Sequence, residues 1–455
     1  MGNRKAPGHD CISSLMLKHA SRKVDCNLFY IFRAAARLGY FPDAWKIAKI
    51  IPIPKPGKPK TAVSSYRPIS LLSIVGKVFE SCIHKVLSEH LAKNNIIVDQ
   101  QFGFRQNHST IGQVARITQA ITHDLNTRRC TAMVLLDLAK AFDTIWHHAL
   151  LYKLHLIGLD SGFVRLIRSY LSNRFLYAFI PVIKSALLPV SAGVPQGSIL
   201  GPILFIVFIN DIPRSFPFCY LALFADDTAA YTSSYRAETA IRKLQAYLNE
   251  IVSFFKSWKL QLNSDKTEAI LFARRPVQIA GERTLNFEID GHIVPWSDTV
   301  RYLGIILDKR LNWRSAAADR VTKALKVLNA LYPTFLKKST INRGIRLNIY
   351  KMCIRPVLTY GAQVWWNCVS NATKRSLQIL QNKALKIILN KPIRFSTAEL
   401  HSLSSIPLMK TYVDKLIDNY NVSGHSNPMV QRTGSYNVSA IPYRIKVPFP
   451  LMRQA

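Results

Sequence analysis

Two neighbouring carboxylates, Asp226 and Asp227, lie in an apolar stretch and could hold a divalent cation. They follow Phe224 and Ala225, and apolar residues flank the group on both sides, which predicts two short strands joined at the acids. Two acids buried side by side are costly unless a cation offsets their charge. Because Asp is also a common turn residue, an ordinary hairpin turn is the alternative interpretation.

A third carboxylate, Asp137, lies near the end of the apolar run 131–138, which has the composition of a buried strand. Two divalent ions about 4 Å apart can promote phosphoryl transfer, and carboxylates from different strands are suitable ligands. The sequence therefore indicates a phosphoryl-transfer site built from Asp137 and the two neighbouring acids. For Asp143, on the polar and helix-like sequence that follows, we predict a solvated or helix-capping role.

A glycine-containing loop, residues 193–198 with the sequence GVPQGS, lies between the acidic segments and precedes the apolar run 199–209. Two glycines and a proline define a backbone that another molecule can approach closely. Such a loop ahead of a helix suits stacking or hydrogen bonding against a base pair. We expect the run 199–209 to form a buried helix, because it is too short to span a bilayer.

The spacing of apolar residues predicts strands or helices in the other parts of the chain. Residues 46–129 alternate apolar strands with basic loops and include a helix around 76–92. Apolar residues at helical spacing recur at 319–331, 342–358 and 373–389. After about residue 420 the sequence becomes rich in Asn, Ser, Gly and Pro, which predicts a loosely ordered tail.

Composition independently predicts a nucleic-acid partner. Lys and Arg number 61 against 26 acids, giving a formal charge of +35 and a pI near 10.1, so binding to anionic polymers should weaken as salt rises. A hydrophobic fraction of 49% excludes a disordered basic tail. The seven cysteines are scattered and predict neither a disulfide framework nor a zinc site, as is typical of a reducing compartment.

Together, Asp137, the loop 193–198 and the acidic pair resemble the palm of a reverse transcriptase, and more closely that of a non-LTR (LINE-like) retrotransposon of the jockey type. Similar segments follow in the same order over most of the chain. They lie at residues 5–10, 53–58, 66–72, 101–105, 262–267, 302–305 and 355–361. The resemblance implies an α+β right-hand polymerase with fingers, a palm containing an antiparallel sheet, and a helical thumb.

The same resemblance implies domain boundaries. Residues 1–45 would be an entry segment, 46–129 the fingers, 130–311 the palm, 312–420 the helical thumb and 421–455 a loosely ordered tail. Basic thumb residues would grip the template-primer duplex through its phosphates, with a merely solvated basic face as the alternative. These residues are Lys337, Lys338, Arg343 and Arg346.

The implied activity is RNA-directed DNA polymerisation from a primer 3′-hydroxyl. Asp137, Asp226 and Asp227 would hold two Mg²⁺ ions, with Mn²⁺ a possible substitute and the carbonyl of Leu138 an extra ligand. Since neighbouring strand side chains point to opposite faces, Asp226 is the preferred ligand of the pair. The implied partners are an RNA template, a DNA primer, deoxynucleotides and the RNA of the mobile element, with no membrane; the sequence fixes no oligomeric state.

Further roles follow from the resemblance, residue by residue. Phe142 matches an aromatic gate against the ribose 2′-hydroxyl, with a plain core phenylalanine as the alternative. Lys55 and Arg67 would bind the incoming triphosphate, Gln196 would lie near the nascent base pair, and Lys266 would protonate the leaving pyrophosphate. Lys55 could equally belong to a basic loop, and Lys266 to the surface. The implied template contacts are Gln101, Arg105, Ser109 and Gly197.

The chain opens almost at the first of these segments, and we find in it no endonuclease, cysteine-rich knuckle or ribonuclease H region. We therefore expect either a fragment of a longer protein or a truncated copy, located in the nucleus and cytoplasm. Two alternatives to an active reverse transcriptase remain: an inactive nucleic-acid-binding relic, and a related polymerase of another branch, such as an intron maturase or an RNA-copying RNA polymerase. Phe142 argues against ribonucleotide use.

Overall fold

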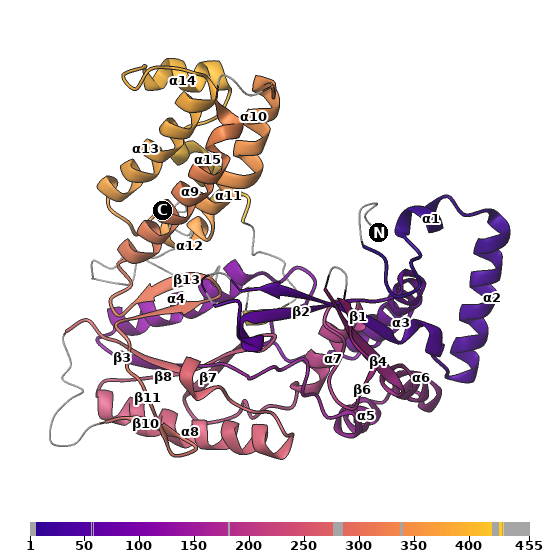
Figure 1. Ribbon diagram of the computed structural model, residues 1–455. Coiled ribbons are helices and arrows are strands. Elements are labelled where there is room, and N and C mark those ends of the chain that lie inside the picture. Colours follow the sequence, from indigo (N-terminus) through magenta and orange to yellow (C-terminus); the bar gives the residue numbers. More distant parts are fainter. Residues whose placement is uncertain are drawn as a thin grey trace.

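The computed structural model describes residues 6–55, 57, 59–180, 183–275, 285–336, 340–420, 427–429 and 431 (Figure 1). The predicted loosely ordered tail therefore falls mostly outside the described residues. Asn427 is one described exception: it is only 1% exposed, and its Nδ2 donates to the carbonyl of Asp99 at 2.9 Å. At this residue the tail packs against the body of the protein, contrary to our expectation.

A four-stranded antiparallel sheet, which we call the palm sheet, carries the predicted acids. Its strand order is β7-β8-β3-β9. The strands are β7 (Cys219–Phe224), β8 (Asp227–Ser234), β3 (Cys130–Leu136) and β9 (Glu268–Phe272). β3 is paired on both sides and almost fully buried, which explains its continuous apolar sequence. The predicted strand before Asp137 and the predicted pair of strands around Asp226 are both present.

Both faces of the palm sheet are covered, by α4 (Thr110–Asn126) and α8 (Ala237–Ser257). Ala132, Val134 and Leu136 of β3 belong to the core shared with α8, whereas Met133 belongs to the core shared with α4 and the C-terminal helices. Side chains of a strand alternate between its two faces, so one short strand joins both cores. Because β3 packs into both cores, the strand end that precedes Asp137 is held firmly in place.

A second sheet lies beside the palm sheet. Its path is β2-β1-β4-β5, with β6 also paired to β4. The strands are β1 (Ile47–Pro54), β2 (Tyr66–Leu71), β4 (Arg174–Ile180), β5 (Ile183–Lys184) and β6 (Leu188–Val190). β1 pairs in parallel with β4, so this sheet combines the predicted fingers range with strands from the predicted palm range. The helix α3 (Ile74–Lys93) confirms the one predicted around residues 76–92.

The remaining elements complete the described fold (Figure 1). The helices are α1 (Ser14–Lys18), α2 (Arg22–Leu38), α5 (His147–Leu156), α6 (Ser161–Leu171), α7 (Leu200–Phe208), α9 (Arg314–Phe335), α10 (Arg343–Ile349), α11 (Arg355–Thr359), α12 (Ala362–Trp365), α13 (Asn371–Ile388), α14 (Thr397–Ser404) and α15 (Met409–Asp418). The small strands are β10 (Phe287–Ile289), β11 (His292–Val294), β12 (Thr299–Tyr302) and β13 (Ile305–Asp308). Single 3-10 turns span Asp43–Trp45, Val63–Ser65 and Ser264–Lys266, and a π-turn spans Tyr350–Ile354.

The buried helix α7 is held at both ends by charged side chains. Oε2 of Glu80 accepts hydrogen bonds from the backbone N–H groups of Ile199 and Leu200, at 2.7 and 3.2 Å. At the other end, Nζ of Lys153 donates to the carbonyl of Phe208 at 2.5 Å. A negative charge at the N-terminus and a positive charge at the C-terminus both complement the helix dipole. Because α7 is fixed in this way, the glycine-containing loop before it is also anchored.

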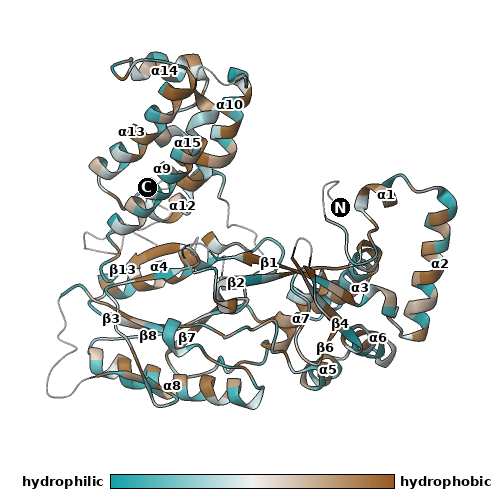
Figure 2. Cartoon of the chain, viewed as in Figure 1, coloured by the Kyte–Doolittle hydropathy of each residue, from teal (hydrophilic) through white to brown (hydrophobic). Residues whose placement is uncertain are grey.

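The C-terminal part is helical, as predicted. α9, α13 and the continuous run from α10 to α11 cover the three segments with helical apolar spacing. These helices alternate hydrophilic and hydrophobic residues along their length, and they stand to one side of the sheets (Figure 2). In the described part of the chain, no helix is both long enough and apolar enough to cross a membrane.

Candidate active site

The three predicted carboxylates meet at one end of the palm sheet. In the β7–β8 hairpin Phe224 pairs with Asp227, which leaves Ala225 and Asp226 as the turn. Leu136, the last residue of β3, pairs with Thr228 of β8. Asp137, the residue directly after β3, therefore lies beside the start of β8. The pairing of the strands places the three acids at the same end of the sheet.

Burial and mutual repulsion both raise the pKa values of the two acids in the hairpin. Asp226 is half-buried, and burial together with the nearby charge of Asp137 raises its pKa. Asp227 is more exposed, yet partial burial of its carboxylate, with the charges of Asp226 and Asp137, raises its pKa to about 6. A positive charge placed between these groups would relieve that repulsion.

Lys266 supplies one positive charge at this site. Its Nζ lies 3.0 Å from Oδ2 of Asp137, and it also opposes the rise in the pKa of Asp226. The segment before Lys266 is tied to the acid by the backbone, because the N–H of Asn263 donates to the Asp137 carbonyl at 2.8 Å. The structure thus places the predicted proton donor beside the predicted metal ligands.

The donor set suits a hard divalent cation, since Mg²⁺ prefers oxygen ligands. Over the described residues, however, no three His, Cys, Asp or Glu side chains are grouped closely enough to form a ready-made metal site. Asp137 is paired with Lys266 instead. The oxygen donors and the negative charge of these residues therefore suit a divalent cation, although their side chains are not already arranged around one. Leu138, whose carbonyl was the predicted extra ligand, has a buried side chain and pairs with Leu262.

Gln101 is turned into the protein and does not line an open template path, which corrects our prediction. Its side chain is 1% exposed. Oε1 accepts hydrogen bonds from the backbone N–H groups of Gly103 at 2.7 Å and Ala225 at 3.0 Å. A Cβ on Gly103 would lie only 2.2 Å from the Ala225 nitrogen, so only glycine allows this approach. Gln101 and Gly103 form a support beneath the turn that carries Asp226.

Side chains of α4 support the outer edge of the same hairpin. Nε2 of Gln113 donates to the carbonyl of Leu223 at 3.0 Å, and Nη2 of Arg116 donates to the carbonyl of Leu221 at 3.0 Å. β7 is the edge strand of the palm sheet, and these bonds reach carbonyls on its outer side, where the Leu223 carbonyl also accepts from the N–H of Phe102 at 2.9 Å. The sequence pointed to neither residue, because a polar side chain on a helix is ordinarily a surface feature.

Two further predicted template contacts are also engaged within the protein. Nη1 of Arg105 donates to the carbonyls of Val98 and Gln101, at 2.9 and 3.2 Å, and burial lowers its pKa. Ser109 caps the N-terminus of α4, where its Oγ accepts from the N–H of Gly112 at 3.0 Å. Ser109 remains exposed, whereas the Arg105 guanidinium is partly committed to holding its own loop.

The glycine-containing loop packs against β2 and against the segment that contains Asp143. Nε2 of Gln196 donates to both carboxylate oxygens of Asp143, at 2.9 and 3.0 Å. Asp143 lies in an exposed turn before α5, where it neither continues a helix nor caps one; of the two predicted roles, this position rules out capping and fits the solvated role. The loop also contacts β2: the N–H of Ser70 donates to the Gln196 carbonyl at 3.2 Å, and a Cβ on Gly197 would lie 3.0 Å from the Ser70 carbonyl.

Three further predicted nucleotide-binding residues lie on β2, directly after β1 and before α5. Arg67 is exposed on β2, three residues from the strand position that contacts the loop. Lys55 follows β1, where its N–H donates to the Ser65 carbonyl at 2.7 Å. Phe142 is only partly buried, with its ring centroid 4.8 Å from that of Phe205. A cavity of about 410 Å³ opens beside the loop, lined in part by Gln196, Asp143 and Ser70.

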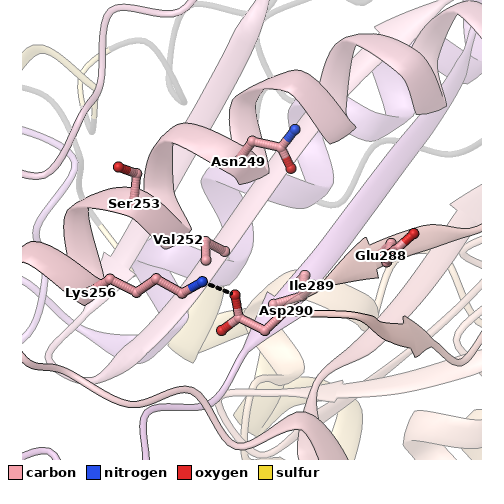
Figure 3. Close-up of a pocket in the computed structure, with 7 residues that line it drawn as sticks. All are labelled: Asn249, Val252, Ser253, Lys256, Glu288, Ile289 and Asp290. Carbon is pink, nitrogen blue, oxygen red and sulfur yellow. Dashed lines mark ion pairs between the residues drawn. The ribbon is translucent and has the colours of Figure 1, made fainter.

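A separate hollow of about 310 Å³ lies between α8 and β10 (Figure 3). An ion pair between Lys256 and Asp290, with 2.5 Å between Nζ and Oδ1, crosses its edge. None of the predicted site residues lines this hollow. Of the basic residues predicted to grip a duplex, Arg346 donates to the carbonyl of Phe335 and Arg343 to that of Leu403, whereas Lys337 and Lys338 lie outside the described residues.

Comparison with known proteins agrees with this geometry. Residues 53–307, more than half of the chain, match the family described as reverse transcriptase (RNA-dependent DNA polymerase). The chain is 32% identical over 427 residues to a probable RNA-directed DNA polymerase from transposon BS of Drosophila melanogaster, covering 92% of this chain and 46% of that protein. It is 30% identical over 460 residues to the RNA-directed DNA polymerase from mobile element jockey of the same organism, covering 99% and 49%.

The chain thus spans about half the length of the curated relatives it matches. Among solved structures, apo telomerase from Candida tropicalis is similar with a TM-score of 0.43 and 13% identity, covering 85% of this chain and 66% of that one.

Proposed function

Because the chain belongs to the reverse transcriptase (RNA-dependent DNA polymerase) family, we propose that it extends a primer 3′-hydroxyl with deoxynucleotides on an RNA template. One observation carries the proposal: Asp137, Asp226 and Asp227 converge at one end of the palm sheet, next to Lys266. Carboxylates carried to one end of a sheet by neighbouring strands are the kind of oxygen ligand that two-cation phosphoryl transfer uses.

Reverse transcriptases generally depend on divalent metal ions. In this chain Asp137 and Asp226 would hold Mg²⁺, with Asp227 and the carbonyl of Leu138 as further oxygen ligands and Mn²⁺ as a substitute. When bound, the ions would offset negative charge on the reacting phosphate. Burial and the neighbouring carboxylate charges raise the pKa values of Asp226 and Asp227, and a bound cation would favour their ionised forms, which supports this assignment.

The protein's own side chains would select and orient the nucleotide. Phe142, partly buried five residues after Asp137, would place its ring against the sugar and exclude a 2′-hydroxyl. Arg67 would bind phosphate oxygens through its planar guanidinium, with Lys55 nearby, and Gln196 would contact the nascent pair. Lys266, already beside Asp137, would protonate the leaving pyrophosphate.

The proposed partners are an RNA template, a DNA primer and the RNA of a jockey-like mobile element. The formal charge of +35 supports binding to such polyanions. A nuclear and cytoplasmic location belongs to the same proposal.

Primer extension on an RNA template would test the proposal. The purified chain would be compared with Asp226→Ala, and deoxynucleotides with ribonucleotides, in the presence of Mg²⁺. Extension that needs both Asp226 and deoxynucleotides is the expected result. A folded protein that binds RNA in a salt-sensitive way but adds no nucleotide would instead identify the inactive relic.

A further inference from the structure

The end of the palm sheet opposite the carboxylates carries a cluster of arginines. β3 is antiparallel to both of its neighbours, β8 and β9, so the residues that precede β3 meet those that follow the other two strands. Arg128 and Arg129 precede β3, Tyr235 follows β8, and Arg274 and Arg275 follow β9. The three strands that bring the acids together at one end therefore bring these basic residues together at the other.

These residues form a concave site, which we call the arginine hollow. Arg128, Arg129, Tyr235, Arg274 and Arg275 line a cavity of about 610 Å³, together with Cys130, Ala237 and Ala273. Among the residues that the structure describes, no acidic side chain lines it. Four guanidinium groups around one cavity make its wall strongly basic, which favours an anionic ligand.

Tyr235 distinguishes the hollow from an ordinary basic surface. Its side chain is 70% exposed, although an aromatic ring gains most from burial. The guanidinium carbon of Arg129 lies 5.0 Å from the centre of its ring. Arginine planes and exposed aromatic rings are the groups on which unpaired bases stack, and guanidinium groups also fit phosphate oxygens in a bidentate manner.

We propose that the arginine hollow binds single-stranded RNA, with phosphates on the arginines and one base on Tyr235. β3 has seven residues, so at about 3.3 Å per residue the hollow lies roughly 23 Å from the carboxylates. At about 3.4 Å per stacked nucleotide, at least about seven nucleotides are needed to reach from one end to the other. The bound strand is thus an unpaired part of the RNA beyond the copied base pair. This rests on the proposed function only in taking RNA as the polymer.

The test compares RNA binding by the whole chain and by the double variant Arg129→Ala/Arg275→Ala. A single-stranded RNA of about 30 nucleotides would be titrated across a salt series, and the slope of log affinity against log salt recorded. Removing two phosphate contacts should lower that slope by about 1.4, at about 0.7 per contact for a single strand. Tyr235→Ala should weaken binding about tenfold without changing the slope, because it removes stacking and no charge.

The double variant Arg168→Ala/Arg242→Ala removes the same charge from exposed positions on α6 and α8 and serves as the matched control. Equal slopes for the two double variants, or unchanged affinity in Tyr235→Ala, would overturn the proposal. A loss seen with DNA of the same length but not with RNA would overturn the assignment to RNA.

Nucleotide addition distinguishes this proposal from the proposed function. With a template whose single-stranded part is about four nucleotides, too short to span the sheet, the arginine variant should extend primers as the wild type does. If the wild type extends nothing, the proposed function fails, while the binding experiment still decides the hollow.

Discussion

The side-chain oxygen of Gln101 lies 3.0 Å from the backbone nitrogen of Ala225, the residue immediately before Asp226. This hydrogen bond joins a segment 124 residues away in sequence to the turn that carries the central carboxylate. Gln101 is therefore placed to position Asp226, without itself reaching the reacting groups.

Replacing Gln101 by Met should lower kcat roughly tenfold to a hundredfold while leaving the KM for deoxynucleotide nearly unchanged, because a small displacement of a reacting group is costly. Gln113→Met is the matched control, since Gln113 is equally buried and also bonds to β7, at Leu223. Both variants should lose about 1–3 kcal/mol of stability. Equal losses of kcat in the two would show that Gln101 acts only through stability.

Lys266→Met should slow nucleotide addition about a hundredfold or more, as expected for loss of a proton donor. The chain offers a matched ion pair: Lys256 is as exposed as Lys266, at 64%, and is also bonded to an aspartate, Asp290 (Figure 3). Single-turnover rates of Lys266→Met and Lys256→Met would be compared. A wild-type rate in Lys266→Met would show that Lys266 is a surface residue and does not donate the proton.

Phe142→Val should let the enzyme accept ribonucleotides, raising the ratio of kcat/KM for ribonucleotides over deoxynucleotides about ten- to two-hundredfold. Phe104→Val is the control, because Phe104 lies edge-on to Phe142, with 6.3 Å between ring centroids, and is 54% exposed. If Phe142→Val destabilises the protein but keeps the same selectivity, Phe142 is a core residue and no gate.

Lys153→Met should change the pH dependence of stability. Burial lowers the pKa of Lys153 to about 8 from 10.5, whereas the unfolded chain keeps its proton up to the higher value. Between these two pH values the unfolded state binds more protons, so the wild type gains stability as pH rises, by up to about 3 kcal/mol.

The variant lacks this gain, and its side chain can still pack among Phe208, Phe254 and Trp258. Denaturant unfolding at about pH 8 and about pH 10 would measure the difference. Parallel behaviour of the two proteins would mean that Lys153 is not titrating in the folded state.

The acids and the helices were predictable for local reasons. Asp137 and the pair at 226–227 each follow an apolar run. A strand that is buried on both faces needs such a nearly continuous apolar sequence, so these strands are visible in the sequence. The C-terminal helices show their apolar spacing directly. These features depend on residues that are near one another in sequence.

The support of the site was not predictable, because it depends on distant pairings. Nothing near Gln101 indicates that the turn at Ala225 will lie above it, and β1 pairs with β4 across more than a hundred residues. The polar sequence after Asp143 is typical of a helix, but the residue lies in a turn and accepts a hydrogen bond from the distant Gln196. Side chains that bond to a remote backbone leave no periodic signal in the sequence.

Single-nucleotide addition to a primer on an RNA template, measured across a Mg²⁺ series, tests the central claim most directly. Asp137→Asn and Asp226→Asn should each abolish addition at every Mg²⁺ concentration, while Asp265→Asn, an exposed aspartate beside Lys266, should keep it. Addition by either of the first two variants at the wild-type rate would contradict the assignment of these carboxylates as the catalytic centre.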